Sequence, residues 1–245
     1  MKGGEPVRVL LIIPAYNEAE TLPGLVKTVE NFAARQKDFD LDYIIINDGS
    51  RDGTEVLCKK NRWHAVHLAG NLGIGGAVQT GYLLAKLKHF DAAVQFDGDG
   101  QHDIESLPAL LAPIAAGEAD FVVGSRFVGA GENFRSTFMR RVGIRFLSAI
   151  IRLVTGQRIT DPTSGYRAAS APVIRLLAEH YPVDYPEPES LVELVKAGLR
   201  VQEAPVNMFE RAHGVSSISP LKSVWYMVKV SLAILCTGIR KKGGK

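Results

Sequence analysis

Residues 92–102 read Ala-Ala-Val-Gln-Phe-Asp-Gly-Asp-Gly-Gln-His, a mostly apolar run that passes directly into an acidic, glycine-rich turn. A short apolar run bounded by such a turn predicts a buried strand followed by a loop. The same pattern occurs twice earlier in the chain. Residues 9–13, Val-Leu-Leu-Ile-Ile, run into Pro14, and residues 43–46, Tyr-Ile-Ile-Ile, run into Asn47. This repeated order, a strand that ends in a polar loop, is what decides the fold.

Helical patterns separate the apolar runs and set the fold class. We expect helices at 21–32, 52–61 and 75–87, and further strands at 65–68 and 121–124. Strands without alternation, each followed by a helix, predict a parallel sheet with both faces covered. The second half adds helices at 138–155 and 191–197, a polar loop at 161–167 and an edge strand at 201–206. The chain is therefore predicted to be α/β, with a Rossmann-like, mostly parallel sheet flanked by helices.

Ligands of such sheets bind beyond the carboxyl ends of the strands, so the loops at those ends are the candidate site. Three of them are polar: residues 14–18 (Pro-Ala-Tyr-Asn-Glu), 47–50 (Asn-Asp-Gly-Ser) and 97–102 (Asp-Gly-Asp-Gly-Gln-His). Any one of them could be an ordinary turn. Together they predict a single polar crevice.

Two carboxylates in the third loop suggest a metal site. Asp97 and Asp99 are separated by one glycine at the end of a strand. Mg²⁺ and Mn²⁺ prefer oxygen ligands and leave coordination positions open to phosphate oxygens. The pair therefore predicts a divalent ion shared with the phosphates of a nucleotide, as a metal stabilises a leaving diphosphate.

The glycines at 70–76 invite a different interpretation, the dinucleotide fingerprint of short-chain dehydrogenases, with Tyr82 and Lys86 as a Tyr-x-x-x-Lys pair. In that class the glycines follow the first strand, whereas here they follow the third. The tyrosine and lysine also follow at once on the same helix. We therefore reject the dehydrogenase interpretation and keep a phosphate-binding turn or a simple helix start as alternatives.

Composition narrows the class of protein. The 245 residues carry a net charge of only +3, too small to indicate a nucleic-acid partner. The two cysteines, Cys58 and Cys236, match neither a disulfide framework nor a zinc motif. The first residues lack the apolar core of a signal peptide. These features predict a cytoplasmic protein.

Five segments taken in order resemble the family-two glycosyltransferases, which have the GT-A fold. They are 14–18, 47–54, 97–102, 124–126 (Gly-Ser-Arg) and 164–167 (Ser-Gly-Tyr-Arg), and the similarity extends over about residues 8–217. Within that family the chain is most similar to the dolichol-phosphate mannose synthases and bacterial polyprenyl-phosphate glycosyltransferases. The resemblance implies inverting transfer of a sugar from a nucleotide-sugar donor to a polyprenyl-phosphate or lipid-linked glycan acceptor.

The resemblance also implies roles for residues on the donor side. Pro14, Tyr16 and Glu18 match the first donor-binding loop of the family, with Glu18 toward the nucleoside. Asp48 matches the carboxylate that recognises the base.

Roles in metal and phosphate binding follow in the same way. Asp97 and Asp99 match the metal and diphosphate aspartates, with Mg²⁺ or Mn²⁺ as the ion, and Gln101 matches a further metal ligand. Basic residues that meet the diphosphate or the acceptor phosphate are implied at Arg126, Arg141 and Arg211. The predicted catalytic residues are Asp99, Arg126 and Glu189.

Glu189 keeps two interpretations. It stands where the family carries an acidic residue that can act as a general base when the acceptor is a sugar hydroxyl. A phosphate acceptor is already ionised and needs no base. Alternatively, Glu189 is a helix-start carboxylate after Pro188, which is favourable by itself.

Residues 224–239 are apolar, contain Trp225 and Tyr226, and end in Arg-Lys-Lys at 240–242. This pattern favours an amphipathic interfacial helix, with a core helix as the alternative. We therefore divide the chain into a catalytic domain (1–217) and a C-terminal interfacial helix with a basic tail (218–245). The expected location is peripheral, at the inner face of the membrane, on the bilayer itself or on a separate membrane protein.

Two other functions were weighed. A sugar nucleotidyltransferase should carry a basic glycine-rich loop after its first strand, where this chain has the acidic residues 14–18. A non-catalytic nucleotide-binding membrane adaptor would have no need of Asp97, Asp99 and Gln101. Both are less consistent with the sequence than a glycosyltransferase.

Overall fold

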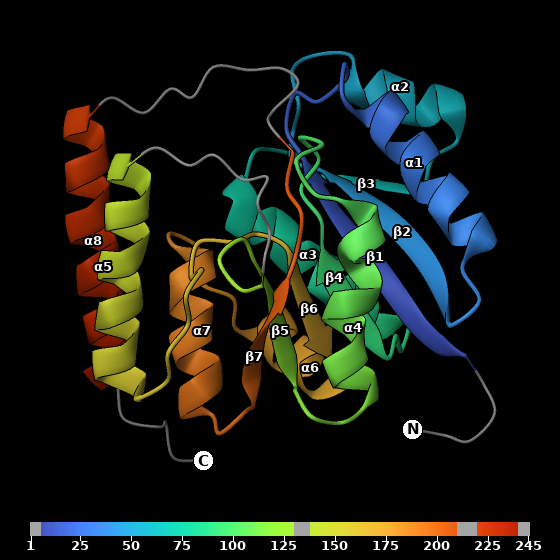
Figure 1. The fold of residues 1–245 in the computed structure, drawn as a ribbon. Helices are drawn as coiled ribbons and strands as arrows, with labels where there is room; N and C mark the ends of the chain where they lie inside the picture. The colour runs from blue at the N-terminus through green and yellow to red at the C-terminus, as the bar shows by residue number, and fades with distance from the viewer. Residues whose placement is uncertain (1–5, 130–137, 210–219, 240–245) are drawn as a thin grey trace.

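The computed structural model describes residues 6–129, 138–209 and 220–239. They form one seven-stranded sheet between two layers of helices (Figure 1). The sheet order is β3-β2-β1-β4-β6-β5-β7, and every strand is parallel to its neighbours except β6. The strands are β1 (Val7–Ala15), β2 (Phe39–Asn47), β3 (Ala65–His67), β4 (Ala92–Gln95), β5 (Phe121–Ser125), β6 (Arg167–Ser170) and β7 (Val201–Pro205). The predicted mostly parallel α/β sheet is confirmed.

The central strands explain why the sheet needs both layers. In β1, residues 9–13 are all at most 4% exposed, although successive side chains point to opposite faces. A strand that is apolar on both faces must be covered on both faces. The odd-numbered residues of β1 belong to one core cluster and the even-numbered ones to the other.

Helices of the first layer pack on the odd-numbered face. They are α1 (Leu22–Arg35), α2 (Thr54–Asn61) and α4 (Leu107–Ala115), the last preceded by a 3₁₀ turn (Ile104–Ser106). α1 buries residues 22, 25, 26, 29 and 32, which lie on one face of a helix with 3.6 residues per turn. Pro23 in its first turn is compatible with a helix start.

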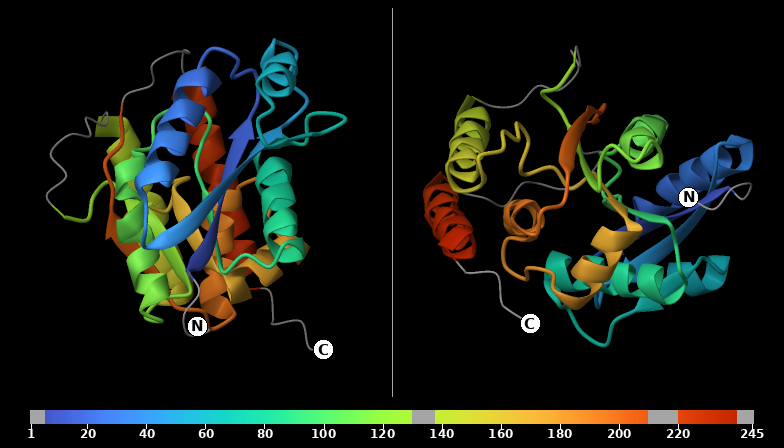
Figure 2. Two further views of the ribbon diagram at one scale, coloured as in Figure 1. Left: turned by 90° about the vertical axis from the view of Figure 1, so that its right-hand side faces the viewer. Right: turned by 90° about the horizontal axis from the view of Figure 1, so that it is seen from below.

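The second layer packs on the even-numbered face and consists of α3 (Gly73–Leu87), α6 (Ala171–Glu179) and α7 (Pro186–Lys196). α3 lies very close to β1, because a Cβ at Gly81 would overlap the side chain of Ile12. Two longer helices, α5 (Phe138–Thr155) and α8 (Pro220–Ile239), lie side by side beyond α7, at the β7 end of the sheet (Figures 1 and 2).

Strand β6 was not predicted, because residues 161–167 were interpreted as a loop only. Its sequence, Arg-Ala-Ala-Ser, has no β-branched residue and no alternation. It becomes a strand through its position, since it pairs with β4 on one side and β5 on the other, antiparallel to both. Tertiary pairing therefore overrides a weak local preference. The edge strand predicted at 201–206 is confirmed as β7.

Helix α8 has one buried face. Val230 and Ile234 are fully buried in the core cluster of the second layer, and Lys196 of α7 donates to the backbone oxygen of Thr237 at 2.9 Å. The predicted C-terminal helix thus packs on the catalytic domain, which agrees with the core alternative for that face, while its outer face stays exposed. The basic residues 240–242 lie outside the described residues. None of the helices in the described ranges is both long and apolar enough to span a bilayer.

Candidate active site

The first two polar loops are tied together at the carboxyl edge of β1 and β2. Asn17 N donates to Ser50 Oγ at 2.9 Å, Glu18 N donates to Thr54 Oγ1 at 3.1 Å, and Arg51 N donates to Asn17 Oδ1 at 2.8 Å. Asn17 has a positive φ of 58°, a conformation that asparagine tolerates. These bonds make residues 14–19 and 47–54 one rigid platform.

The predicted donor residues lie on this platform with different surroundings. Pro14 is buried in β1, Glu18 is half-buried, and Tyr16 is exposed. Asp48 is buried, and its two carboxylate oxygens accept from Leu72 N at 2.6 Å and Gly73 N at 2.9 Å. The first turn of α3 therefore already holds a carboxylate. The amides of Leu72 and Gly73 are therefore not open to a phosphate.

The acidic loop after β4 lies against the platform. A Cβ at Gly98 would stand only 2.8 Å from Pro14 O, so the residue between Asp97 and Asp99 has no room for a side chain. Asp99 Oδ1 accepts from Gln101 N at 3.1 Å, which shapes the turn. The Gln101 side chain reaches back to Phe209 O at 3.3 Å. Asp97, Asp99 and Gln101 thus belong to one short loop whose backbone is fixed by these contacts.

Asp97 is held on both oxygens by buried neighbours. Gln95 Nε2 donates to Oδ1 at 3.2 Å, and His102 Nε2 lies 3.1 Å from Oδ2. Because Asp97 can only accept, the proton belongs on Nε2 of His102. Burial alone would raise the pKa of Asp97, but the bonds from His102 and Gln95 and the nearby Arg167 charge outweigh it and lower that pKa. The group is an ionised carboxylate in a fixed orientation.

The aromatic rings of Tyr166 and Phe96 pack against His102. Its ring centroid lies 4.8 Å from that of Tyr166 and 5.5 Å from that of Phe96, and its side chain is 3% exposed. Tyr166 donates its hydroxyl to Asp103 O at 3.2 Å. The His102 imidazole therefore cannot turn away from Asp97 without disturbing two packed rings.

The predicted metal set is small. Among the described residues, no three His, Cys, Asp or Glu side chains come together as a metal-binding group. Two carboxylates and an amide oxygen fit a hard divalent cation that completes its shell with water and phosphate oxygens. The chemistry of Asp97, Asp99 and Gln101 therefore fits Mg²⁺ or Mn²⁺ bound together with a nucleotide.

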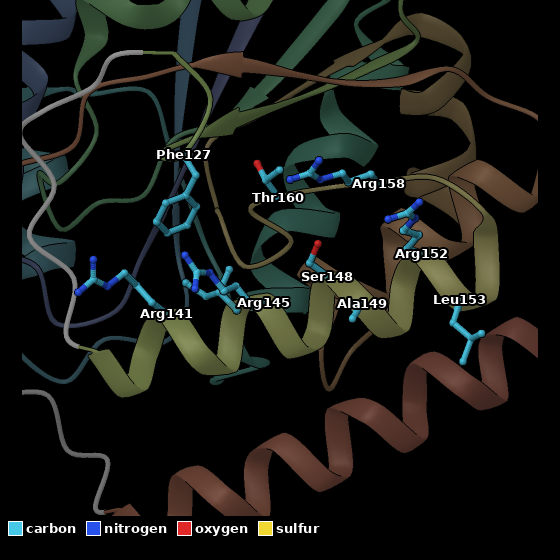
Figure 3. A pocket seen from close by; sticks show the side chains of 10 residues that line it. Phe127, Arg141, Arg145, Ser148, Ala149, Arg152, Leu153, Arg158 and Thr160 are labelled. Atoms are coloured by element: carbon cyan, nitrogen blue, oxygen red, sulfur yellow. The ribbon is translucent and has the colours of Figure 1, made fainter.

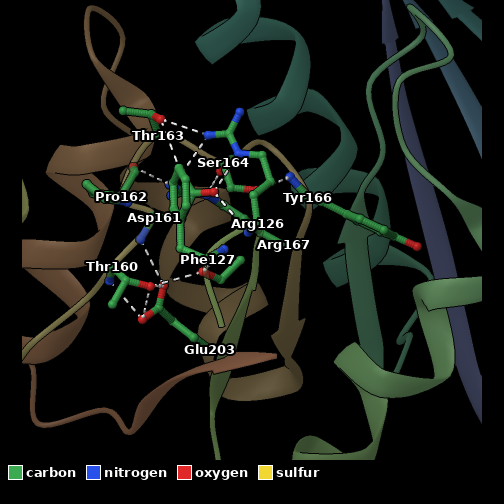
Figure 4. A network of polar contacts seen from close by, with 11 residues as sticks. Arg126, Phe127, Thr160, Asp161, Pro162, Thr163, Ser164, Tyr166, Arg167 and Glu203 are labelled. Atoms are coloured by element: carbon green, nitrogen blue, oxygen red, sulfur yellow. Dashed lines mark hydrogen bonds and ion pairs between the residues drawn. The ribbon is translucent and has the colours of Figure 1, made fainter. Parts of the chain in front are cut away.

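Arg126, for which a phosphate contact is predicted, is held by a buried carboxylate. Its side chain is 3% exposed and makes a two-pronged ion pair with the fully buried Asp161, with Nε–Oδ2 and Nη2–Oδ1 distances of 2.6 Å (Figure 4). Thr163 Oγ1 accepts a further bond from Nη2 at 3.1 Å. The ion pair engages Nε and Nη2 of the guanidinium group. The described contacts make Arg126 a support for the loop before β6.

Glu203 of β7 completes that support. Its carboxylate accepts from Thr160 N at 2.8 Å and Asp161 N at 2.9 Å (Figure 4). Arg167, 1% exposed, donates to the backbone oxygens of Ser164 at 2.5 Å and Pro162 at 2.9 Å. Residues 160–166 are therefore fixed from three sides, and this loop places Gly165 directly against Asp97.

Glu189 and Asp97 do not share an environment. Burial raises the pKa of Glu189, Glu193 and Asp184 add to the rise, and the nearby Thr237 of α8 opposes it. Residues two apart on a helix do not face the same way. Glu187 is accordingly the acidic residue beside the site. Burial raises its pKa, the Arg167 charge opposes the rise, and Asp97 adds to it.

The two remaining predicted residues are Arg141 and Arg211. Arg141 is exposed in the first turn of α5, where it lines a groove with Phe127 (Figure 3). Arg211 lies outside the described residues. Sequence reasoning missed Gln95, His102, Arg167 and Glu187. The only signal for the first two was their position on either side of Asp97.

Comparison with known proteins identifies the family of this chain. The model of glycosyl transferase family 2 matches residues 10–177. The chain is 32% identical over 222 residues to the polyprenol monophosphomannose synthase of Mycolicibacterium smegmatis, covering 86% of this chain and 81% of that protein. It is also 32% identical over 217 residues to the UDP-N-acetylglucosamine–dolichyl-phosphate N-acetylglucosaminyltransferase of Methanococcus voltae, covering 81% and 84%. The chain belongs to glycosyl transferase family 2.

Solved structures define the fold more closely. Glucosyl-3-phosphoglycerate synthase from Mycobacterium tuberculosis, in complex with phosphoglyceric acid, superposes with a TM-score of 0.70 at 22% identity and covers 97% of this chain and 82% of that one. Another structure of that enzyme contains Mn²⁺ and uridine diphosphate, with a TM-score of 0.68 at 20% identity. At these identities the likeness shows the fold alone, and it confirms the predicted GT-A architecture.

Gly165 gives a direct test of the Asp97 geometry. A Cβ at this position would lie 2.5 Å from Asp97 Oδ2, and Asp97 cannot yield easily because Gln95 and His102 hold it. Gly165→Ala is expected to lower kcat/KM for sugar transfer about a hundredfold, the scale for a displacement of about 1 Å at a reacting site. Gly24→Ala in α1 is the matched control, since nothing lies within 4 Å of its Cβ. Wild-type kcat/KM in Gly165→Ala would contradict the role of this orientation.

Proposed function

We propose that this chain transfers a sugar, with inversion at the anomeric carbon, from a nucleotide-diphosphate sugar to a polyprenyl phosphate at a membrane surface. The observation that carries the proposal is the ionised Asp97, held by Gln95 and His102 one residue from Asp99 at the carboxyl edge of the sheet. Relatives named for transfer to polyprenol, undecaprenyl phosphate and dolichyl phosphate support the acceptor class.

The joined loops of β1 and β2 are assigned to the nucleoside. Tyr16 is exposed at their rim, and Pro14 and Glu18 lie beneath it. Asp48 is buried and accepts two backbone bonds, so it holds the start of α3 in place. Each carboxylate oxygen has a second lone pair with which it can accept from a base. Asp48 therefore supports the donor platform as well as reading the base.

Asp97, Asp99 and Gln101 are assigned to a divalent ion, Mg²⁺ or Mn²⁺. When bound, such an ion neutralises the charge that develops on a departing diphosphate. The protein's part is orientation. Gln95 and His102 fix the direction of the Asp97 carboxylate, so that little reorganisation is needed during the reaction.

The acceptor side is assigned to basic residues. Arg141 is exposed at the end of α5 nearest the loop after β5, and Arg211 belongs to the same group by resemblance alone. A phosphate monoester with a second pKa of about 6 is ionised near neutrality and attacks without a general base. We therefore assign no proton transfer to Glu189.

Thermal unfolding of the full chain with a panel of nucleotide sugars tests the donor assignment. A true donor at a hundred times its Kd should stabilise the protein by about 2.7 kcal/mol. The increase in Tm is expected with Mn²⁺ or Mg²⁺ and should disappear in EDTA. The best donor is then incubated with polyprenyl phosphate in detergent, and the anomeric configuration of the lipid-linked product is read by NMR.

Three results would overturn the proposal. No nucleotide sugar stabilises the protein, or the product retains the anomeric configuration of the donor. A third is consumption of a sugar 1-phosphate and a nucleoside triphosphate in place of transfer, which would identify a sugar nucleotidyltransferase.

A further inference from the structure

An open groove of about 1040 Å³ runs along one side of α5 and is lined by four arginines (Figure 3). Arg141, Arg145 and Arg152 come from α5, and Arg158 comes from the segment that follows it. Positions 141, 145 and 152 repeat at helical spacing, so their side chains leave the same side of the helix. At 1.5 Å per residue they extend over roughly 16 Å of its length.

None of the described residues that line this arginine groove is acidic. Helix α5 contains no acidic residue. Among the described residues, no carboxylate pairs with any of the four guanidinium groups. Like charges at i, i+4, such as Arg141 and Arg145, destabilise a helix when nothing compensates them. The clustered positive charges of the groove therefore favour the binding of anions.

An apolar stripe lies directly beside the arginines on the same helix. Met139, Val142, Phe146 and Leu153 are 73%, 45%, 53% and 81% exposed. With 3.6 residues per turn, these positions occupy the sector next to that of the arginines. Helix α8, packed alongside, exposes a stripe of its own at Val228, Leu232, Leu235 and Ile239. Exposed apolar residues gathered on two neighbouring helices are typical of an interaction site.

We propose that α5 is the membrane-docking element of this protein: the arginine groove seats phosphate groups of anionic lipids, and the apolar stripe enters the boundary between headgroups and acyl chains. An amphipathic helix with cations beside an apolar face binds an anionic bilayer in this way. The length of the row exceeds what one phosphate can fill, so several headgroups meet it. The inference rests on the proposed function, since a lipid acceptor is reached from the membrane surface.

The charge pattern favours a bilayer over a second copy of the chain. In a twofold symmetric contact the same patch meets itself. The arginine groove would then face another set of arginines without a carboxylate of α5 to offset them. Anionic lipid supplies the missing charge.

Co-sedimentation of the full chain with vesicles of phosphatidylcholine, with and without phosphatidylglycerol, tests the proposal. Binding is expected only with phosphatidylglycerol and should weaken as NaCl is raised. The variant Arg145→Gln/Arg152→Gln/Arg158→Gln is expected to lose on the order of a hundredfold in partition coefficient, because each charge near the surface contributes about fivefold. Phe146→Gln/Leu153→Gln should also weaken binding.

Matched controls use exposed positions elsewhere. Lys27→Gln/Lys60→Gln/Arg175→Gln removes the same charge from α1, α2 and α6. Val56→Gln/Leu87→Gln removes apolar residues that are 68% and 71% exposed on α2 and α3. Both should bind vesicles as the wild type does. Binding of uridine or guanosine diphosphate with Mn²⁺, by calorimetry, reports the donor site separately and should be unchanged in all four variants.

Three outcomes would overturn the docking proposal. The first is equal vesicle binding by the triple-arginine variant and its control. The second is vesicle binding that shows no preference for anionic lipid and that inorganic phosphate displaces but chloride of equal ionic strength does not, and the third is a dimer in solution that Phe146→Gln/Leu153→Gln dissociates while vesicles are not bound. If vesicle binding fails but transfer in detergent persists, the glycosyltransferase assignment stands. If vesicles are bound but no sugar is transferred in detergent, the docking surface stands and the proposed function is wrong.

Discussion

Asp99→Asn is expected to lower sugar transfer about a thousandfold while leaving the free energy of unfolding nearly unchanged. Asparagine keeps the oxygen that accepts from Gln101 N at 3.1 Å, so the turn after β4 can form as before. The substitution removes one of the two negative charges that we assign to the divalent ion. Removing one preorganised electrostatic contact to a developing charge typically costs 10²–10³ in kcat, and a metal ligand stands at the upper end of that range.

The measurement is kcat together with Mn²⁺-dependent binding of the nucleoside diphosphate by calorimetry. Asp42→Asn, an exposed carboxylate of β2, is the control and should keep both properties. Full activity of Asp99→Asn in the presence of EDTA would show that no metal is held here.

Asp161→Ala is expected to destabilise the protein by about 3–5 kcal/mol, the cost of leaving one partner of a buried ion pair uncompensated. Arg126 would keep its charge at 3% exposure and lose two bonds of 2.6 Å. Urea unfolding followed by circular dichroism gives the difference in the free energy of unfolding.

The second arm of that experiment separates an unpaired charge from simple loss of packing. Arg126→Met/Asp161→Leu replaces both partners with apolar side chains and should recover most of the stability. Glu55→Ala, which removes an exposed ion pair with Lys59, should change stability little. A loss below about 1 kcal/mol in Asp161→Ala would mean that water reaches the pair and screens it.

The sheet was largely predictable because its strands carry continuous apolar runs. Strands β1, β4 and β5 and residues 43–46 of β2 carry such runs, a signal that depends only on local sequence. Strand β6 gave no such signal, since pairing with both neighbours creates it. Helices α4 and α6 were also not predicted. Each begins with a proline in its first turn, and α4 contains a second one at Pro113.

The site divides in a similar way. The acidic loop at 97–101 and the platform of residues 14–18 and 48 follow from position at strand ends. The surroundings of the Arg126 and Glu189 side chains could not be predicted from the sequence, because each depends on a partner far along the chain. Arg126 meets Asp161, 35 residues away, and Glu189 lies near Thr237 of α8. The orienting roles of Gln95 and His102 depend on side-chain geometry that spacing alone does not show.

The reversed direction of β6 has a consequence for how this enzyme class can diversify. β5 ends and β6 begins at the same edge of the sheet, and the two strands are neighbours: Val123 pairs with Arg167, and Gly124 N bonds to Tyr166 O at 2.8 Å. The whole stretch from 126 to 166, including α5, therefore departs and returns at adjoining points. Changes in the length of this connection before residue 160 need not alter the register of β5 or β6, whereas residues 160–166 must be kept because they hold Gly165 against Asp97.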